Sequence, residues 1–130
     1  MKEYRLEPSA FDRWLGEYGK AWQTGDPDAV NRLFAGNAAY YETPFDEPMV
    51  GTDAIWQYWS EGAGKSQKNV RFSYDIISTV RHTGIAHWKA TFERIPIGSK
   101  VEIDGILMAE FDEQGMCRVF SEWWHRREGG

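Results

Sequence analysis

The sequence is poor in the features that mark disulfide-rich, metal-binding or membrane-spanning proteins. It has 130 residues and a single cysteine, Cys117, which excludes an internal disulfide framework and a cysteine-rich metal site. The longest clear apolar run is residues 106–109, far short of the ~20 residues that cross a bilayer. Residues 1–5 lack the apolar core of a signal peptide. We therefore expect a cytoplasmic protein with no membrane partner.

The chain also lacks an excess of positive charge. The chain carries 15 Lys and Arg against 20 Asp and Glu, a net charge of −5, which argues against an electrostatic nucleic-acid footprint. A local basic patch at residues 125–127 stays open as an exception. None of the three histidines has a partner at metal-ligand spacing, and no glycine-rich loop follows a strand to cradle a phosphate. We expect no metal, no cofactor and no nucleic-acid partner.

Aromatic residues, by contrast, are abundant. Seven Trp, six Tyr and seven Phe make up 15% of the residues, and 42% of the chain is hydrophobic. Disordered chains are poor in aromatic residues, and a chain of this length has room for one core of ordinary size. The sequence therefore predicts one folded domain over residues 1–130. A domain this small rarely needs so many tryptophans for its core, so we expect some of them to line a ligand pocket.

Three helices are predicted in the first half of the chain. Residues 9–24 place apolar side chains along one helical stripe, with Ser9 as the expected N-cap. A short second helix begins at Pro27, where a missing N–H costs nothing, and ends at Gly36. The third helix is expected within residues 51–64. A strand at residues 38–42 separates the second helix from the third.

From residue 69 onward, apolar and polar side chains alternate, which is typical of strands. Turn-forming residues divide this part of the chain into four strands. Helices followed by an antiparallel meander indicate an α+β fold, with helices packed on one face of a curved sheet. The shared register predicts that one set of side chains points toward the helices: Trp88, Phe92, Leu107, Phe120 and Glu122.

The order of elements and four short motifs resemble the nuclear transport factor 2-like superfamily, in particular its SnoaL-like and ketosteroid isomerase-like branches. The motifs are AWQTGDPDA at residues 21–29, LFA at 33–35, GTDAI at 51–55 and FDEQG at 111–115. The resemblance covers nearly the whole chain. It implies a cone-shaped, cystatin-like α+β barrel, in which a bent sheet wraps around three N-terminal helices and leaves a deep pocket. The family contains isomerases, cyclases, hydrolases and domains without any chemistry, so the fold alone does not choose an activity.

Carried over by position, the resemblance implies three candidate catalytic residues. Glu42 matches the carboxylate base of the isomerase branch, and Tyr18 matches its oxyanion-hole tyrosine. Leu107 stands where that branch has its second oxyanion donor, so the complete isomerase constellation is absent. Glu122 falls where some hydrolase-like members have an acidic residue. A carboxyl group in an aromatic cavity has a raised pKa, which suits general acid or base catalysis.

Each candidate also has a structural alternative. Glu42 could accept hydrogen bonds at a strand end, Glu122 could pair with Arg94, Arg118 or Arg126, and Tyr18 could be an ordinary core tyrosine. The expected walls of the pocket, for which aromatic core filling is the alternative, are Tyr40, Trp56, Trp59, Trp88, Phe92, Leu107, Phe120 and Trp124.

The opposite face of the sheet also carries apolar side chains among polar neighbours. They are Ile85, Ile106, Met108, Val119 and Trp123. Since relatives commonly pair through this face, the resemblance implies a twofold symmetric homodimer.

Three functions fit this sequence. The first is a cofactor-independent acid–base enzyme, of isomerase, cyclase or hydrolase type, that acts on a small apolar substrate, cyclic or acyclic. The second is a module that binds an apolar ligand without turnover. The third is a dimerisation domain whose pocket is filled by its own side chains.

Overall fold

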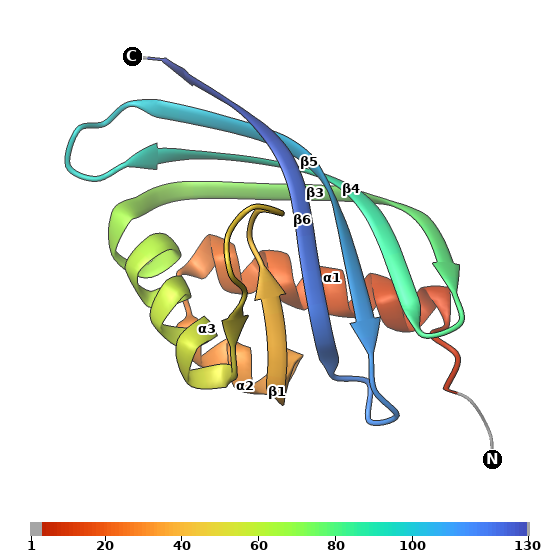
Figure 1. The fold of residues 1–130 in the computed structure, drawn as a ribbon. Coiled ribbons are helices and arrows are strands. Elements are labelled where there is room, and N and C mark those ends of the chain that lie inside the picture. The colour runs from red at the N-terminus through yellow and green to blue at the C-terminus, as the bar shows by residue number, and fades with distance from the viewer. Residues whose placement is uncertain (1–3, 130) are drawn as a thin grey trace.

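A computed structural model describes residues 4–129. Residues 1–3, part of the segment in which no signal peptide is expected, and Gly130, the last residue of the predicted domain, lie outside the described residues. The chain forms, in order, α1 (Pro8–Thr24), η1 (Pro27–Ala29), α2 (Val30–Leu33), β1 (Phe34–Tyr41), β2 (Met49–Val50), α3 (Thr52–Trp59), η2 (Ser60–Ser66), β3 (Gln67–Val80), β4 (Thr83–Arg94), β5 (Lys100–Phe111) and β6 (Cys117–Gly129). The predicted α+β class, with three helices preceding the main sheet, is confirmed (Figure 1).

The first helix follows the predicted stripe but begins differently. Pro8 occupies its first turn and Glu7 is the N-cap, so the expectation that Ser9 caps the helix is wrong. Proline at this position is favourable because its fixed φ suits the helix and the first N–H has no intrahelical partner. Gly25 ends the helix in the left-handed conformation with φ 65°, and its N–H contacts the last carbonyl groups.

The second helix is shorter than predicted. It ends at Leu33, and Gly36 lies inside β1 instead of closing the helix. The reason is tertiary pairing: β1 runs parallel to β6 and antiparallel to β2. Glu42, expected at the end of this strand, is the first residue after it.

The sheet has six strands in the order β2-β1-β6-β5-β4-β3. Strands β3 to β6 form the predicted antiparallel meander, and β1 and β2 extend it beyond β6. The sheet is strongly curved and wraps around α1, while α2 and α3 lie at one end of its concave side (Figure 1). It does not close into a barrel, because β2 and β3 remain as its edge strands.

The concave face of the sheet and the stripe of α1 share one aromatic core. The five side chains predicted to face the helices are all buried: Trp88, Phe92, Leu107, Phe120 and Glu122. Close packing is enforced at Gly84, where a Cβ atom would lie 2.6 Å from the Phe11 ring. No helix among residues 4–129 is both long and apolar enough to cross a membrane.

Candidate functional site

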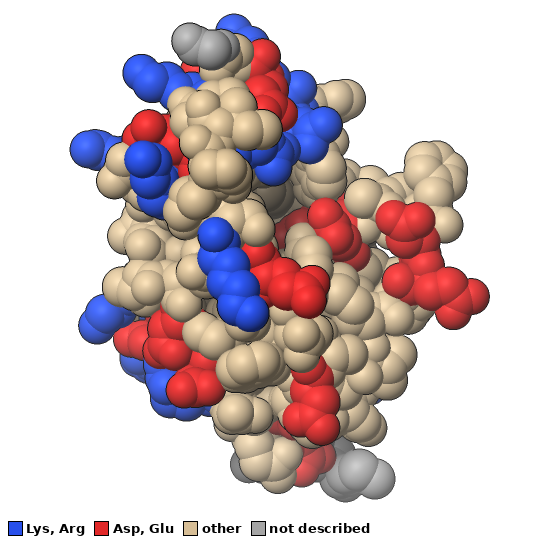
Figure 2. All heavy atoms as spheres, turned by 90° about the vertical axis from the view of Figure 1, so that its left-hand side faces the viewer, with Lys and Arg blue, Asp and Glu red and all other residues tan. Residues whose placement is uncertain are grey.

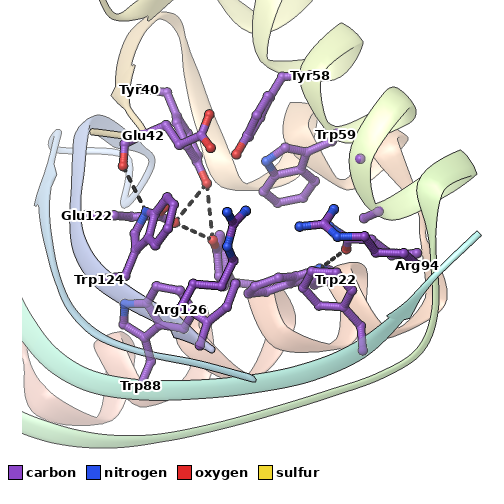
Figure 3. Close-up of a pocket in the computed structure, with 16 residues that line it drawn as sticks. Trp22, Tyr40, Glu42, Tyr58, Trp59, Trp88, Arg94, Glu122, Trp124 and Arg126 are labelled. Carbon is purple, nitrogen blue, oxygen red and sulfur yellow. Dashed lines mark hydrogen bonds between the residues drawn. The ribbon is translucent and has the colours of Figure 1, made fainter. Parts of the chain in front are cut away.

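A cavity of about 240 Å³ opens between α1, the α3–η2 segment and the concave face of the sheet (Figure 3). Many of the predicted site residues line it: Tyr18, Tyr40, Glu42, Trp59, Trp88, Phe92, Glu122 and Trp124. The fold therefore brings both candidate carboxylates, Glu42 and Glu122, and the candidate tyrosine, Tyr18, to one cavity. Their roles in binding and catalysis stay predictions.

Three residues predicted as walls lie elsewhere. Trp56 is on a different side of α3 from Trp59, and its indole Nε1 donates to Asp28 at 2.9 Å. Leu107 and Phe120 point to the concave face as predicted, but both are 0% exposed and belong to the core instead of the cavity lining. These three positions correct the predicted list of wall residues.

At the inner end of the cavity, Glu122 is held by two tyrosines. The hydroxyl groups of Tyr18 and Tyr40 each donate to its Oε1 atom at 3.1 Å, and the two hydroxyl oxygens are 3.2 Å apart. The side chains come from α1, β1 and β6, three elements that are distant in sequence (Figure 3). Glu122 is only 6% exposed, so this cluster is a buried polar network.

The two oxygens of Glu122 are not equivalent. Both tyrosine hydrogen bonds end on Oε1. Oε2 has no hydrogen-bond partner among the described residues. A proton on Oε2 is therefore not committed to another side chain.

Burial raises the pKa of Glu122 to about 8, because the charged form loses its hydration. Hydrogen bonds from Tyr40 and Tyr18 act in the opposite direction, and the nearby charge of Glu42 adds to the increase. The pKa values of Tyr18 and Tyr40 are raised well above their usual value, first by burial and then by the charge of Glu122. Near neutral pH this cluster can hold a proton and transfer it.

Glu122 does not form an ion pair with any of the three arginines named as its alternative partners. Arg94 pairs with Glu128 at 2.9 Å and Arg118 pairs with Glu110 at 3.5 Å. Neither these arginines nor Arg126 lies within 4.0 Å of the Glu122 carboxyl group. The buried acid is therefore stabilised by hydroxyl groups and not by a cation.

Glu42 occupies a different environment, at the rim of the cavity. Its side chain is partly exposed, and its backbone carbonyl accepts a hydrogen bond from the Trp124 indole at 3.1 Å. That bond joins the end of β1 to β6 and so fixes where the chain leaves the sheet. Figure 3 shows the Glu42 carboxylate beside the Tyr58 hydroxyl, across the opening from Arg126.

The wall of the cavity contains one unusual polar atom. The indole Nε1 of Trp88 is buried and has no hydrogen-bond partner among the described residues. Leaving a buried donor unpaired costs about 1–3 kcal/mol. Trp88 is among the lining residues, but Nε1 itself has almost no accessible surface and does not face the cavity (Figure 3).

Sequence reasoning missed several lining residues, namely Trp22, Tyr58, Gln67, Arg94, Ile103 and Arg126. Two of them follow a pattern that could have found them. Trp22 lies one helical turn after Tyr18 on the same stripe, and Arg126 shares the inward register of Glu122 on β6. Gly62 and Ala63 enter the lining through the π-helical turn η2, a geometry that often occurs at functional sites.

A second, more open groove of about 650 Å³ lies between the loop after β1 and the convex face of the sheet. It is lined by Phe45, Ile106 and Trp123, which are exposed, and by the pair His87–Asp104, whose closest atoms are 2.7 Å apart. Glu42, Glu122 and Trp124 touch both this groove and the inner cavity. Among residues 4–129, no three His, Cys, Asp or Glu side chains group as metal ligands would.

Comparison with known proteins agrees with this architecture. The sequence model of a family described as "SnoaL-like domain" matches residues 15–120. A solved structure of SalBIII superposes with a TM-score of 0.75 at 17% sequence identity, covering 88% of this chain and 89% of that one. SalBIII is described as an epoxide hydrolase/cyclase-like enzyme in pyran ring formation in the polyether salinomycin. No curated protein matches the sequence.

Proposed function

This chain belongs to the SnoaL-like domain family, and from that premise we propose that it is a cofactor-independent acid–base enzyme acting on a small, largely apolar, ring-bearing substrate. The observation that carries the proposal is the buried Glu122 carboxyl group, with Oε1 bonded to two tyrosines and Oε2 without a hydrogen-bond partner among the described residues. The aromatic walls would exclude water and hold an apolar body.

In the proposed reaction, Glu122 acts as the general acid. Its raised pKa of about 8 keeps the proton on the carboxyl group near neutral pH. The Oε2 proton passes to an oxygen of the substrate, such as the oxygen of an epoxide, as the carbon–oxygen bond breaks. A water molecule or a hydroxyl group of the substrate adds to the carbon, and its proton passes to Glu42 at the rim. The two carboxyl groups then re-equilibrate by exchanging protons with solvent.

The tyrosines would keep the acid oriented. Because Tyr18 and Tyr40 bind Oε1, they leave Oε2 directed away from them and stabilise the carboxylate that forms when the proton leaves. The fold similarity to an epoxide hydrolase/cyclase-like enzyme supports testing epoxides first. The ketosteroid isomerase-like resemblance supports testing the isomerisation of cyclic unsaturated ketones as a second class.

The test is a turnover screen with aryl and alicyclic epoxides, hydroxy-epoxides and cyclic β,γ-unsaturated ketones. Three variants accompany the wild type: Glu122→Gln, Glu42→Gln and, as a control on the convex face, Asp104→Asn. We expect the two cavity variants to lose activity, the control to keep it, and the wild-type rate to fall above about pH 8 as Glu122 loses its proton. Equal turnover in the wild type and Glu122→Gln would overturn the assignment of Glu122.

Ligand binding without turnover is the second candidate function. It is favoured by the same cavity, which has about 240 Å³ of space and is not filled by its own side chains as a purely structural domain would require. If every compound of the screen binds and none is converted, this second function replaces the first.

A further inference from the structure

The opening of the cavity differs in charge from the rest of the molecule. The chain as a whole has a net charge of −5, yet two arginines, Arg94 and Arg126, line the cavity at its open end. Figure 3 shows both guanidinium groups turned toward the cavity from opposite sides. In Figure 2, Lys and Arg side chains crowd the upper part of this face, near the C-terminal end of the chain, while the right-hand flank shows acidic side chains alone.

Arg126 forms no ion pair with another residue in the described part of the chain. No carboxylate of residues 4–129 lies within 4.0 Å of its guanidinium group, whereas its neighbour Arg127 pairs with Glu102 at 2.6 Å. The two arginines point to opposite faces because side chains alternate along β6. Arg126 therefore brings to the cavity a positive charge that no carboxylate of the described residues contacts directly.

Arg94 is only partly neutralised. Its Nε atom donates to Glu128 at 2.9 Å, and Glu128 also accepts a hydrogen bond from Ser99 at 2.7 Å. These bonds hold Glu128 on one edge of the guanidinium group and leave both terminal nitrogens of Arg94 without a partner in residues 4–129. Hydrogen bonds from Ser99 and Arg94 and the charges of Arg94 and Arg126 lower the pKa of Glu128, so this one carboxylate is near both guanidinium groups. Glu42 lies on the other side of the opening.

The distance between Glu122 at the inner end of the cavity and Arg126 at its open end follows from their spacing along β6. Glu122, Trp124 and Arg126 follow one another on the inward face of β6. At about 3.3 Å per residue, the Cα atoms of Glu122 and Arg126 are about 13 Å apart. The wall between them is aromatic, formed by Trp22, Trp88, Phe92 and Trp124.

We propose that the substrate is an organic anion: a ring-bearing carboxylate whose charged group is bound by Arg126 and Arg94, whose apolar body lies against the tryptophans, and whose distal oxygen reaches Glu122. Guanidinium groups suit this role because they bind carboxylates with paired, charge-assisted hydrogen bonds. This inference rests on the proposed function, since it assigns a substrate class to the same cavity.

The test is isothermal titration with two probes of the same shape, 6-hydroxy-2-naphthoate and 6-hydroxy-2-naphthamide. Each probe has a hydroxyl oxygen at one end, and the two differ only in the charge at the other end. We expect the wild type to bind the acid at least tenfold more tightly than the amide at low salt. Added salt should reduce this preference, because Arg126 is exposed and Arg94 is partly exposed.

The matched variants are Arg126→Gln and Arg127→Gln, which remove the same charge from adjacent residues on opposite faces of β6. We expect Arg126→Gln to abolish most of the preference for the acid and Arg127→Gln to keep it. Circular dichroism checks that both variants are folded. Equal binding of the acid and the amide by the wild type would overturn the inference, as would an unchanged preference in Arg126→Gln.

The outcomes separate this inference from the proposed function. If the amide binds as well as the acid, the cavity remains an apolar ligand site and only the anion assignment fails. If neither probe binds at millimolar concentration, the anion assignment fails together with the idea of an accessible cavity. If the acid is preferred but the turnover screen shows no role for Glu122, the anion site stands and the enzyme proposal fails.

Discussion

The concave and convex faces of strands β4 to β6 are built from alternate residues of the same chain, yet acidic residues on the two faces have opposite environments. On the concave face, the acidic group at the inner end of the cavity, Glu122, is buried and held by hydroxyl groups. On the convex face, Asp104 lies between His87 at 2.7 Å and Lys89 at 4.0 Å and remains exposed. Ion pairs in water contribute little to stability, whereas an acid removed from water has its proton affinity changed. We therefore expect proton transfer on the concave face and dimerisation through the convex face.

The largest expected effect is on turnover by Glu122→Gln. Loss of a positioned general acid typically costs 10²–10⁴-fold in rate, so we expect a decrease of at least about 100-fold in kcat with any substrate found in the screen. Asp104→Asn should change kcat by less than about twofold, because that carboxylate is on the other face. A comparable loss in both variants would remove the distinction between the faces.

The second effect is on the pH dependence of stability. In the folded protein the pKa of Glu122 is about 8 instead of 4.5, so the folded state binds more protons than the unfolded state between these values. The free energy of unfolding should therefore fall as the pH rises from about 4.5 to about 8 and level off above that. The loss should amount to a few kcal/mol, since one pKa unit corresponds to about 1.36 kcal/mol.

Glu122→Gln should remove this slope, because glutamine does not titrate. Urea unfolding of both proteins at pH 5, 6.5 and 8 measures it. A wild-type stability that stays level across this range would show that Glu122 keeps an ordinary proton affinity.

The third prediction concerns the convex face. Trp123 is 44% exposed and Ile106 is 36% exposed, side by side in the β5–β6 ladder. We predict that these residues meet their counterparts in a twofold symmetric homodimer. Trp123→Lys should then weaken association by about 2 kcal/mol or more, as expected for a central aromatic residue of an interface. Sedimentation at micromolar concentration that reports only a 15.0 kDa species for the wild type would contradict this prediction.

A smaller effect is expected from Tyr18→Phe. It removes one hydroxyl group from the Glu122 cluster at a cost of about 1 kcal/mol in stability. The loss of a donor to the carboxylate should also move the alkaline limb of the pH–rate profile to higher pH. Tyr74→Phe is the control, because the Tyr74 hydroxyl donates to Asp12 at 2.7 Å at the protein surface. A limb that stays in place in Tyr18→Phe would indicate that the tyrosine does not influence the acid.

The smallest effect is expected on the stability of Glu42→Gln. Glu42 is partly exposed, its backbone carbonyl accepts a hydrogen bond from Trp124, and its carboxylate lies beside the Tyr58 hydroxyl at the rim of the cavity. We expect the free energy of unfolding at pH 7 to change by less than about 0.5 kcal/mol. A clear loss of stability would mean that the Glu42 side chain holds the strand end in place, and the second proton-transfer role would then need another residue.

The sequence predicts which face of the sheet a side chain is on. It does not predict as well whether that side chain lies in the core or lines the cavity. Alternation correctly assigns Leu107, Phe120 and Glu122 to the concave face. It cannot say which of them meets core side chains and which meets open space, because that depends on where α1 and α3 end against the sheet. Leu107 and Phe120 are sealed by the core, while Glu122 lines the cavity.

Helical spacing explains the error at Trp56. Ile55 and Trp59, four residues apart, share the buried side of α3, and Trp56 points away to Asp28. The arginines were missed for a different reason. Both share the inward register of their strands, but a charged residue near the end of a strand is ordinarily expected in solvent, and the register alone does not show that Arg94 and Arg126 reach the cavity (Figure 3).

The Tyr18–Tyr40–Glu122 cluster contains three short oxygen–oxygen contacts but only two phenolic hydrogens. When the carboxyl group is charged, both hydrogens can point to Oε1 and the contact between the tyrosines carries none. When the carboxyl group is neutral, one tyrosine can turn its hydrogen to the other. The change from one charge state to the other thus needs the rotation of a single O–H bond, with no movement of a heavy atom. An acid built in this way meets little reorganisation cost as its charge appears and disappears.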